Sequence, residues 1–583
     1  HTHHDDPFDD FSRQLLLPNK LSQLGPGVTW FDVDGDGRED LIVGSGKGGL
    51  IGVYRNRGTN GFERLQEPVF AGPVTRDQTS ILGWRSATNQ TFLLAGCANY
   101  EDGLASGPAV RQYDFARKVV DDSLTTQESS TGPLALADVD GNGMLDLFVG
   151  GRVIPGRYPE AASSRIYRQN GHQWRVRGET SRILEKVGLV SGAVFSDLDG
   201  DGFAELILAC EWGPIRIFRN ERGKFVPWDL PVVFPGASSN HEQRTTLSQL
   251  TGWWNGVTTG DFDGDGRLDV AASNWGRNTK YQSHRTQPLT IYYGDFAGDG
   301  TVQLVEAHYE AALQKTVPER QLDDLDKGLP FLNETFSSHR AYSVASVAEV
   351  LGDRLKAAKT WQANWLESTV FLNRGDHFEV RVLPVEAQMA PVFGICVGDF
   401  DGEGNEDLFL SQNFFATQPE TPRYDAGRSL WLRGDGRGGF SAVSGQESGV
   451  AVYGEGRGCA LCDFDGDGRV DLAVAQNSAA TRLYRNQTGR VGLRVRLEGP
   501  VGNPQGIGAV LRLKWGERFG AAREVHAGSG YWSQDSAVQV MATPEPPTQI
   551  WVRWPGGKIV TADIPAGARE ISVELDGQVN LLR

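Results

Sequence analysis

Six short acidic segments constrain the fold of this 583-residue chain more than any other feature. Each has the order acid, apolar, acid, glycine, acid or amide, glycine, two variable residues and acid, and each runs directly into an apolar stretch. The glycines permit the tight turn that brings the acidic side chains inward. The segments cover residues 32–40, 138–146, 197–205, 261–269, 399–407 and 463–471.

Oxygen ligands at positions 1, 3, 5 and 9, with the carbonyl of position 7, suit calcium, which takes six to eight oxygens. Position 12, which is glutamate in an EF-hand, lies here in an apolar run that is typical of a strand. We therefore expect a strand, a calcium loop and a strand, with about six structural Ca2+ sites. The expected ligands are Asp32, Asp34, Asp36, Arg38, Asp40, Asp138, Asp140, Asn142, Met144, Asp146, Asp197, Asp199, Asp201, Phe203, Glu205, Asp261, Asp263, Asp265, Arg267, Asp269, Asp399, Asp401, Glu403, Asn405, Asp407, Asp463, Asp465, Asp467, Arg469 and Asp471.

A second signature follows the apolar runs, as in Val53-Tyr54-Arg55-Asn56 before Phe62 and in Ile217-Phe218-Arg219-Asn220 before Phe225. It predicts a strand, a polar glycine-rich turn and a further strand that opens on an aromatic residue. Together the two signatures resemble the FG-GAP/VCBS repeats, over roughly residues 15–489. The resemblance implies an all-β chain folded as a calcium-binding β-propeller.

The spacing of the acidic loops leaves two counts of propeller blades open. The interval between residues 40 and 138 has room for one blade without a metal loop, with Phe92 to Ala95 as its inner strand. The interval after residue 269 contains a degenerate loop, Asp295 to Thr301, that lacks the acid at position 3. We favour seven blades, with Asp295 in an outer hairpin; the alternative is eight, with Asp295 beginning a blade.

We expect residues 1–10 to be a flexible tail and residues 11–488 to form the propeller. Phe11 to Leu21 is predicted to be a strand that completes the last blade, because that blade lacks its final strand and closure removes exposed sheet edges. Residues 310–365 interrupt the β pattern, and apolar residues at helical spacing from Val344 to Leu351 predict a helical insertion there.

Weak candidates for a ligand or active site lie in and near this insertion: His284, His308, Tyr309, His339 and Arg340. Such side chains suit a sugar or a carboxylate, and they can supply the base and the cation that an eliminating enzyme needs. We favour a binding protein for a glycan or a protein partner. A carbohydrate lyase or dehydratase and a structural subunit of a cell-surface assembly are the alternatives.

Residues 489–583 show short alternating strands without acidic loops, which predicts a small β-sandwich. Gly506 to Ala509, Gly528 to Gln534 and Trp554 to Lys558 resemble the ASPIC/UnbV domain. That domain follows such propellers in exported proteins related to cartilage acidic protein. The resemblance is specific for architecture and says little about biochemical role.

The chain carries 57 basic and 74 acidic side chains, a formal net charge of −17. This acidity argues against a nucleic-acid partner, and no long apolar run predicts a membrane span. Calcium loops and the first residue, His1, lead us to expect an exported protein that is extracellular, periplasmic or at the cell surface. The five cysteines are too scattered for a disulfide framework, and the oligomeric state stays open.

Overall fold

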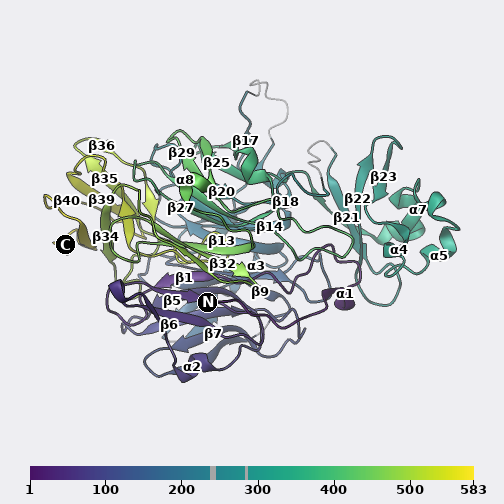
Figure 1. The fold of residues 1–583 in the computed structure, drawn as a ribbon, viewed down its shortest axis with the longest axis horizontal. Coiled ribbons are helices and arrows are strands. Elements are labelled where there is room, and N and C mark those ends of the chain that lie inside the picture. Colours follow the sequence, from purple (N-terminus) through teal and green to yellow (C-terminus); the bar gives the residue numbers. More distant parts are fainter. Residues whose placement is uncertain (126, 172, 237–244, 282–286) are drawn as a thin grey trace.

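The computed structural model describes residues 1–125, 127–171, 173–236, 245–281 and 287–583 (Figure 1). The fold is all-β, with 41% strand and 9% helix. A ring of sheets occupies the middle, and a small insertion and a C-terminal domain lie at opposite ends of the long axis (Figure 1). No helix in the described ranges is both long enough and apolar enough to cross a membrane.

Seven sheets form the ring in the part of the chain that the structure describes. Their innermost strands β1, β5, β9, β13, β19, β27 and β31 contact one another in that order, and β31 contacts β1. We call these sheets the blades. The first four are β1 (Val28–Phe31), β2 (Asp40–Val43), β3 (Gly52–Asn56) and β4 (Phe62–Arg64); β5 (Gln78–Arg85), β6 (Thr91–Cys97), β7 (Pro108–Asp114) and β8 (Val119–Thr125); β9 (Ser130–Ala137), β10 (Asp146–Val153), β11 (Arg165–Asn170) and β12 (Gln173–Val176); β13 (Leu189–Ser196), β14 (Glu205–Gly213), β15 (Arg216–Asn220) and β16 (Phe225–Pro227).

The remaining blades depart from this four-strand pattern in two places. The fifth gains a parallel fifth strand beside β26, and the seventh has three strands. They are β19 (Val257–Gly260), β20 (Asp269–Ala272), β25 (Thr369–Asn373), β26 (Phe378–Val382) and β17 (Val232–Val233); β27 (Val392–Gly398), β28 (Asp407–Gln412), β29 (Leu430–Gly434) and β30 (Phe440–Val443); β31 (Glu455–Cys462), β32 (Asp471–Asn477) and β33 (Arg482–Tyr484). The short β18 (Gly252–Trp253) pairs with β14.

Every acidic loop joins the innermost strand of a blade to its second strand, so the six loops lie at one end of the ring. We call this end the loop face. Both loop glycines have positive φ, as in Gly35 (77°) and Gly37 (85°), a conformation that costs other residues energy. The blade without an acidic loop is β5–β8, as expected. Phe92 to Ala95 forms part of its second strand, however, and the inner strand is β5.

The insertion lies between β20 and β25 and is a sheet covered by short helices, rather than the helical segment that its spacing predicted. The degenerate loop joins β21 to β22 in this sheet, which is separate from the strands of the fifth blade. Local helical spacing was visible in the sequence, whereas the pairing of β21 with the distant β24 was not. The elements are β21 (Leu289–Gly294), β22 (Gln303–Glu310), β23 (Lys315–Pro318), α4 (Leu322–Leu325), α5 (Leu332–Thr335), α6 (His339–Tyr342), α7 (Val347–Leu351), η3 (Gly352–Ala357) and β24 (Lys359–Ala363).

The N-terminal segment differs from both expectations. Residues 1–10 are packed against the ring: His3 is 4% exposed, and Thr2 forms a β-bridge with Ala480. Residues 11–21 contain the end of helix α1 (Asp10–Arg13) and no strand. Leu16 and Leu17 pack in one core with the insertion, because that core offers their apolar side chains burial that an edge strand would not.

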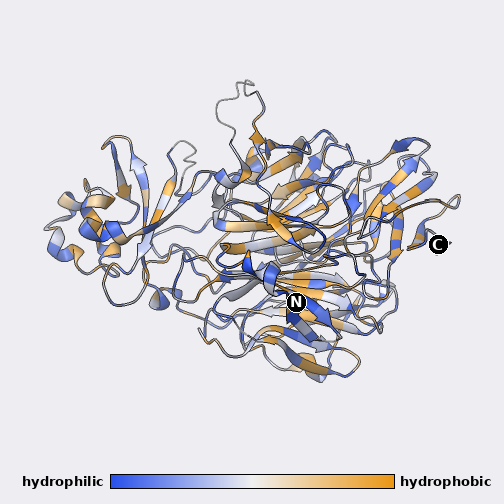
Figure 2. Cartoon of the chain, turned by 180° about the vertical axis from the view of Figure 1, so that it is seen from behind, coloured by the Kyte–Doolittle hydropathy of each residue, from blue (hydrophilic) through white to orange (hydrophobic). Residues whose placement is uncertain are grey.

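The C-terminal domain consists of two sheets whose apolar faces share one core with residues of the third blade, as Val495, Leu511, Ile550 and Leu147 show. Figure 2 shows orange apolar and blue polar segments interspersed along the strands. The sheets are β38 (Gln539–Met541), β34 (Leu493–Glu498), β41 (Glu570–Glu574) and β42 (Val579–Leu581), and β36 (Arg518–Phe519), β35 (Val510–Trp515), β39 (Gln549–Arg553) and β40 (Ile559–Asp563), with β37 (Arg523–Glu524) beside β35. Elsewhere lie η1 (Gly58–Asn60), α2 (Pro68–Ala71), α3 (Gly178–Arg182), η2 (Leu247–Gln249), η4 (Val385–Gln388) and α8 (Gly445–Ser448). All five cysteines are buried and free.

Candidate metal sites on the loop face

The loop of residues 261–269 shows how the repeat gathers its acids. Asp261, Asp263 and Asp265 each place a carboxylate oxygen within 4.8 Å of the others. Asp261 Oδ1 and Asp263 Oδ1 are buried and accept no hydrogen bond. Buried, unpaired carboxylate oxygens beside a third carboxylate are unfavourable unless a cation neutralises them, and hard oxygen donors suit calcium. These residues therefore fit a calcium ion.

Other loops bring their carboxylates together in the same way, again within 4.8 Å. The combinations differ: the first loop contributes positions 1, 3 and 5, whereas two others contribute positions 1, 3 and 9. These acidic clusters can bind metal ions. They are Asp32, Asp34 and Asp36; Asp197, Asp199 and Glu205; and Asp399, Asp401 and Asp407.

The acid at position 9 also holds the loop together. Asp269 Oδ2 accepts from Phe262 N at 3.0 Å, and Asp269 Oδ1 accepts from Asn373 N at 2.7 Å. The side chain thus links the start of the loop to the following hairpin. Asp40, Glu205, Asp407 and Asp471 accept the equivalent pair of backbone hydrogen bonds.

Burial is the main cause of raised pKa values in these loops. It raises the pKa of Asp261 to about 6, that of Asp40 to about 7 and that of Asp407 to about 8. Hydrogen bonds from the backbone lower each of these pKa values, but the burial effect is larger. A bound divalent cation would favour the ionised carboxylates and oppose this effect.

An arginine from the third strand, or from the turn after it, pairs with the acid at position 3 of every acidic loop. Arg55 lies 2.7 Å from Asp34, Arg219 lies 2.7 Å from Asp199, and Arg433 lies 2.9 Å from Asp401. Arg168 pairs with Asp140, Arg374 with Asp263, and Arg485 with Asp465. The arginine recurs in the second signature, so it was visible in the sequence. Its pairing with the acidic loop was not predicted.

The degenerate loop lacks this chemistry. Gln303 stands where the other loops have the acid of position 9, and its Oε1 accepts from Phe296 N at 2.6 Å. Both oxygens of Asp295 accept backbone hydrogen bonds, from Gly298 N at 2.7 Å and Gly300 N at 3.0 Å. With neutral residues at positions 3 and 9, this loop keeps the turn but has fewer negative charges for a divalent ion.

The C-terminal domain covers the loop face through contacts with the acids at position 1. Arg553 pairs with Asp197 at 2.7 Å, Ala522 N donates to Asp261 Oδ2 at 2.8 Å, and Arg494 pairs with Asp463. Away from position 1, Arg523 pairs with Glu406 at 2.7 Å. Four loops of four blades are therefore joined to one domain by charge-assisted contacts.

The segment of residues 527–536 runs from this domain into the middle of the ring and contacts the innermost strands. Gly530 exchanges two backbone hydrogen bonds with Val257, at 2.8 and 3.0 Å. Trp532 Nε1 donates to Ser191 O at 3.0 Å, and Gln534 Oε1 accepts from Gly83 N at 2.8 Å. We call this segment the channel plug, because it fills the axial space that a propeller otherwise leaves open. The motif was visible in the sequence, but its place in the ring was not.

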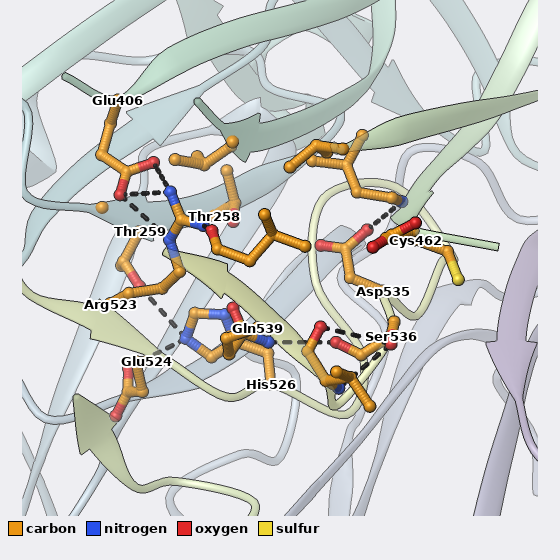
Figure 3. A pocket seen from close by; sticks show the side chains of 18 of the residues that line it. Thr258, Thr259, Glu406, Cys462, Arg523, Glu524, His526, Asp535, Ser536 and Gln539 are labelled. Atoms are coloured by element: carbon orange, nitrogen blue, oxygen red, sulfur yellow. Dashed lines mark hydrogen bonds and ion pairs between the residues drawn. The ribbon is translucent and has the colours of Figure 1, made fainter. Parts of the chain in front are cut away.

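A small cavity of about 50 Å³ remains between the loop face and the C-terminal domain (Figure 3). Its wall holds the Arg523–Glu406 ion pair, and His526 Nε2 lies 2.8 Å from Glu524 and 3.3 Å from Thr259 Oγ1 (Figure 3). A volume of this size accommodates one or two water molecules, and a sugar ring does not fit. Its charged side chains already have partners within the protein, as the Arg523–Glu406 pair and the contact of His526 with Glu524 show, which indicates a structural interface.

The candidates of the insertion are not brought into one site by their contacts. His308 Nδ1 lies 2.7 Å from Glu319, whereas His339 is exposed and its Nε2 lies 3.3 Å from Asp323. Hydrogen bonding to Glu319 is the first cause of the raised pKa of His308. Tyr309 is half-buried on β22, Arg340 is exposed on α6, and His284 lies outside the described residues.

One acidic group lies away from the loop face and was missed. Asp5, Asp77 and Glu101 place carboxylate oxygens within 4.8 Å of one another, and Lys47 Nζ lies 3.2 Å from Glu101 Oε2. These residues come from four separate segments, so no local spacing in the sequence indicated that they would meet. Their contacts fasten the N-terminal segment to the first two blades.

The fold and its acidic loops are those of a β-propeller built from repeats whose acidic clusters can bind metal ions. A model of the FG-GAP-like repeat matches residues 138–208 and 197–272, and a model of the ASPIC and UnbV domain matches residues 499–579. The chain therefore contains FG-GAP-like repeats and a C-terminal ASPIC and UnbV domain, which confirms the architecture predicted from the sequence signatures. This combination is that of β-propeller proteins of a binding or adhesion type, and FG-GAP repeats are typical of extracellular or cell-surface proteins.

Three of the solved structures that the chain is similar to share 10–12% of its residues and have TM-scores below 0.5. Sqt1 of Saccharomyces cerevisiae is 11% identical, with a TM-score of 0.37, over 80% of this chain and 97% of Sqt1. The rhamnogalacturonan lyase YesW is 12% identical, with a TM-score of 0.26, over 79% of this chain and 82% of the lyase. The Bacillus licheniformis rhamnogalacturonan lyase PL11 is 10% identical, with a TM-score of 0.22, over 91% of this chain and 80% of that one. No curated protein sequence matches the chain.

Proposed function

We propose that this protein is an exported binding protein in which calcium ions hold the loop face rigid and the insertion presents a surface to a glycan or protein partner. The observation that carries the proposal is the pair of buried, unpaired oxygens of Asp261 and Asp263 inside a three-carboxylate cluster. Such a cluster is costly without a cation, and weak multi-carboxylate sites fill at extracellular calcium concentrations.

The metal ions act as structural elements in this proposal. Each loop directs its acids inward and shares them with an arginine of its own blade or with the C-terminal domain. An ion held in this way offers few open coordination positions to a substrate. We therefore assign calcium to all six acidic loops and none to the degenerate loop at Asp295.

The insertion supports partner binding because it combines a rigid base with an exposed polar surface. Leu322, Leu325 and Tyr342 pack its helices into the core, while Asp323 and His339 stand 75% and 69% exposed at their side chains. Exposed aromatic, histidine and arginine groups on rigid elements suit sugars and carboxylates. A lyase is less well supported, since His308 and His339 pair with different carboxylates.

Calcium titration calorimetry of the chelator-treated protein tests the metal assignment. We expect about six equivalents of Ca2+ to bind, and Asp263→Asn with Asp265→Asn to remove one of them. The matched control is Asp295→Asn in the degenerate loop, which should leave the number unchanged. Equal stoichiometry in the first variant and the wild type would contradict the assignment.

A panel of acidic and neutral polysaccharides tests the partner class. Retention on a polysaccharide that is weakened by His339→Ala with Arg340→Ala, without new ultraviolet absorbance from elimination, supports a glycan-binding protein. Elimination products that disappear in His308→Ala would instead establish a lyase and overturn the proposal. Arg182→Ala, at a helix end on the third blade, serves as the matched surface control.

A further inference from the structure

The seventh blade is one strand short at its outer edge. Its sheet has the order β31–β32–β33, whereas the other six blades contain at least four strands in the described residues. The chain leaves the blade after Asn486 and enters the C-terminal domain. Leu483, in the middle of β33, is 37% exposed. A strand edge of this kind offers unpaired N–H and C=O groups to another strand.

The other blades show what normally covers this position. In the first, fourth, fifth and sixth blades the fourth strand opens on phenylalanine. In the first and sixth blades this ring packs on the phenylalanine at position 2 of the preceding blade's loop. The ring centroids of Phe62 and Phe464 lie 5.6 Å apart, and those of Phe440 and Phe262 lie 5.5 Å apart. For the seventh blade the corresponding residue of the preceding loop is Phe400, and the described part of the chain supplies no fourth strand there with an aromatic residue to pack on it.

A groove of about 330 Å³ lies where that partner would be. Aromatic and aliphatic side chains line much of it: Phe400, Phe409, Trp431, Val450, Leu472 and Tyr484. The groove thus joins an apolar wall to the open edge of β33. This combination is the one by which proteins bind extended peptides as an added strand, with main-chain hydrogen bonds for affinity and side-chain pockets for specificity.

The N-terminal residues define the direction of the added strand. Thr481 N donates to His1 O at 2.8 Å and Thr2 pairs antiparallel with Ala480, so residues 1–3 lie beside the residues that precede β33. Fourth strands in the first and sixth blades are also antiparallel to the third. An antiparallel segment on β33 would therefore end next to His1.

We propose that the edge of β33 and this groove bind an extended peptide segment of a partner protein, with an aromatic side chain on Phe400. The peptide completes the seventh blade as its fourth strand. This surface is separate from the insertion, so the inference does not depend on the proposed function. If both hold, the protein has a second surface for contact with a protein partner.

The chain itself supplies a probe, because the fourth strand of the sixth blade places its phenylalanine, Phe440, on the phenylalanine of the preceding loop, Phe262. A blocked, fluorescently labelled peptide with the sequence of residues 438–445, which contains Phe440, should bind the intact protein saturably in fluorescence anisotropy. Replacement of its phenylalanine by alanine should weaken binding about tenfold or more. N-methylation of alternate peptide bonds should abolish binding, since it removes the main-chain donors of the added strand.

Two protein variants complete the test. Leu483→Pro removes a backbone donor from the edge and should weaken binding, whereas Leu581→Pro, on the exposed edge strand β42 of the C-terminal domain, is the matched control. Circular dichroism with thermal unfolding verifies that both variants are folded; if Leu483→Pro is not, Leu483→Asp replaces it.

Three results would overturn the proposal. The first is the absence of saturable binding up to about millimolar peptide. The second is binding of the alanine peptide and of the N-methylated peptide as tight as that of the parent peptide. The third is concentration-dependent dimerisation that Leu483→Asp abolishes. The last result would make a second copy of this chain the occupant.

Discussion

The side-chain amide of Asn56 in the first blade donates to Phe464 O in the seventh blade at 2.6 Å, across 408 positions of sequence. Asn220, Asn373 and Asn486 donate in the same way to position 2 of the preceding blade's loop. The sixth blade has a glycine at the position of these asparagines, and the backbone N–H of Gly438 donates to Phe262 O instead. Each of these loops is therefore capped by the next blade around the ring.

Removal of this cap should weaken the ring. Asn56→Ala loses the hydrogen bonds to Phe464 O and Glu39 O, and we expect a loss of about 1–3 kcal/mol in the free energy of unfolding. Chemical denaturation measures it. Gln169→Ala is the matched control, because Gln169 donates within its own hairpin, to Gly171 O, and the blade before it has no acidic loop. Equal losses in the two variants would show that the cap between blades adds nothing.

The channel plug should contribute strongly to stability. Trp532 is 3% exposed and stacks on Tyr531 at 4.6 Å, so Trp532→Ala should cost about 3–5 kcal/mol. Hydrogen exchange should accelerate most in the innermost strands that the plug contacts. The control is Trp515→Ala, which removes a half-buried tryptophan of the C-terminal domain and should leave hydrogen exchange in those strands unchanged.

Chelation should lower the melting temperature. Each ion bound to the native state alone adds about 2.7 kcal/mol when calcium is present at about a hundred times its dissociation constant. Differential scanning calorimetry with and without chelator should therefore show a large fall that added Ca2+ reverses and Mg2+ reverses less, because Mg2+ prefers six ligands in a tighter geometry. An unchanged melting temperature would rule out structural ions.

His3 should make the protein less stable in acid. Burial and the nearby positive charge of Arg457 lower the pKa of His3 to about 4, from 6.5 in the unfolded chain. The unfolded state then binds more protons below pH 6.5, so this contribution to stability is full above pH 6.5 and is lost as the pH falls toward 4. The loss amounts to about 3 kcal/mol.

A double comparison isolates this effect. The difference in unfolding free energy between pH 7 and pH 4.5 should be smaller in His3→Asn than in the wild type, since asparagine can still accept from Ser478 N. His4→Asn, a substitution of the exposed neighbouring histidine, should keep most of the wild-type difference, because burial and Arg457 lower the pKa of His3 more than His4 does. A similar pH dependence in all three proteins would refute the role of His3.

Local chemistry made much of this protein predictable from its sequence. The glycines and acids of loops such as residues 32–40 specify a turn, and alternating apolar residues specify the strands on either side. These are interactions between residues a few positions apart, so spacing alone revealed the loops, the hairpins and the all-β class. The same logic placed a blade without a metal loop between residues 40 and 138.

Only the tertiary structure decided which distant segments meet. In the assembled fold the N-terminal residues pack against the seventh blade, residues 527–536 lie in the channel and β21 pairs with β24. His308 and His339 contact different carboxylates. The physical reason is that such contacts depend on how whole sheets bury their apolar faces and close their edges. The assembled ring satisfies those conditions. The residues that make these contacts are far apart in the chain, so their spacing in the sequence has no regular period.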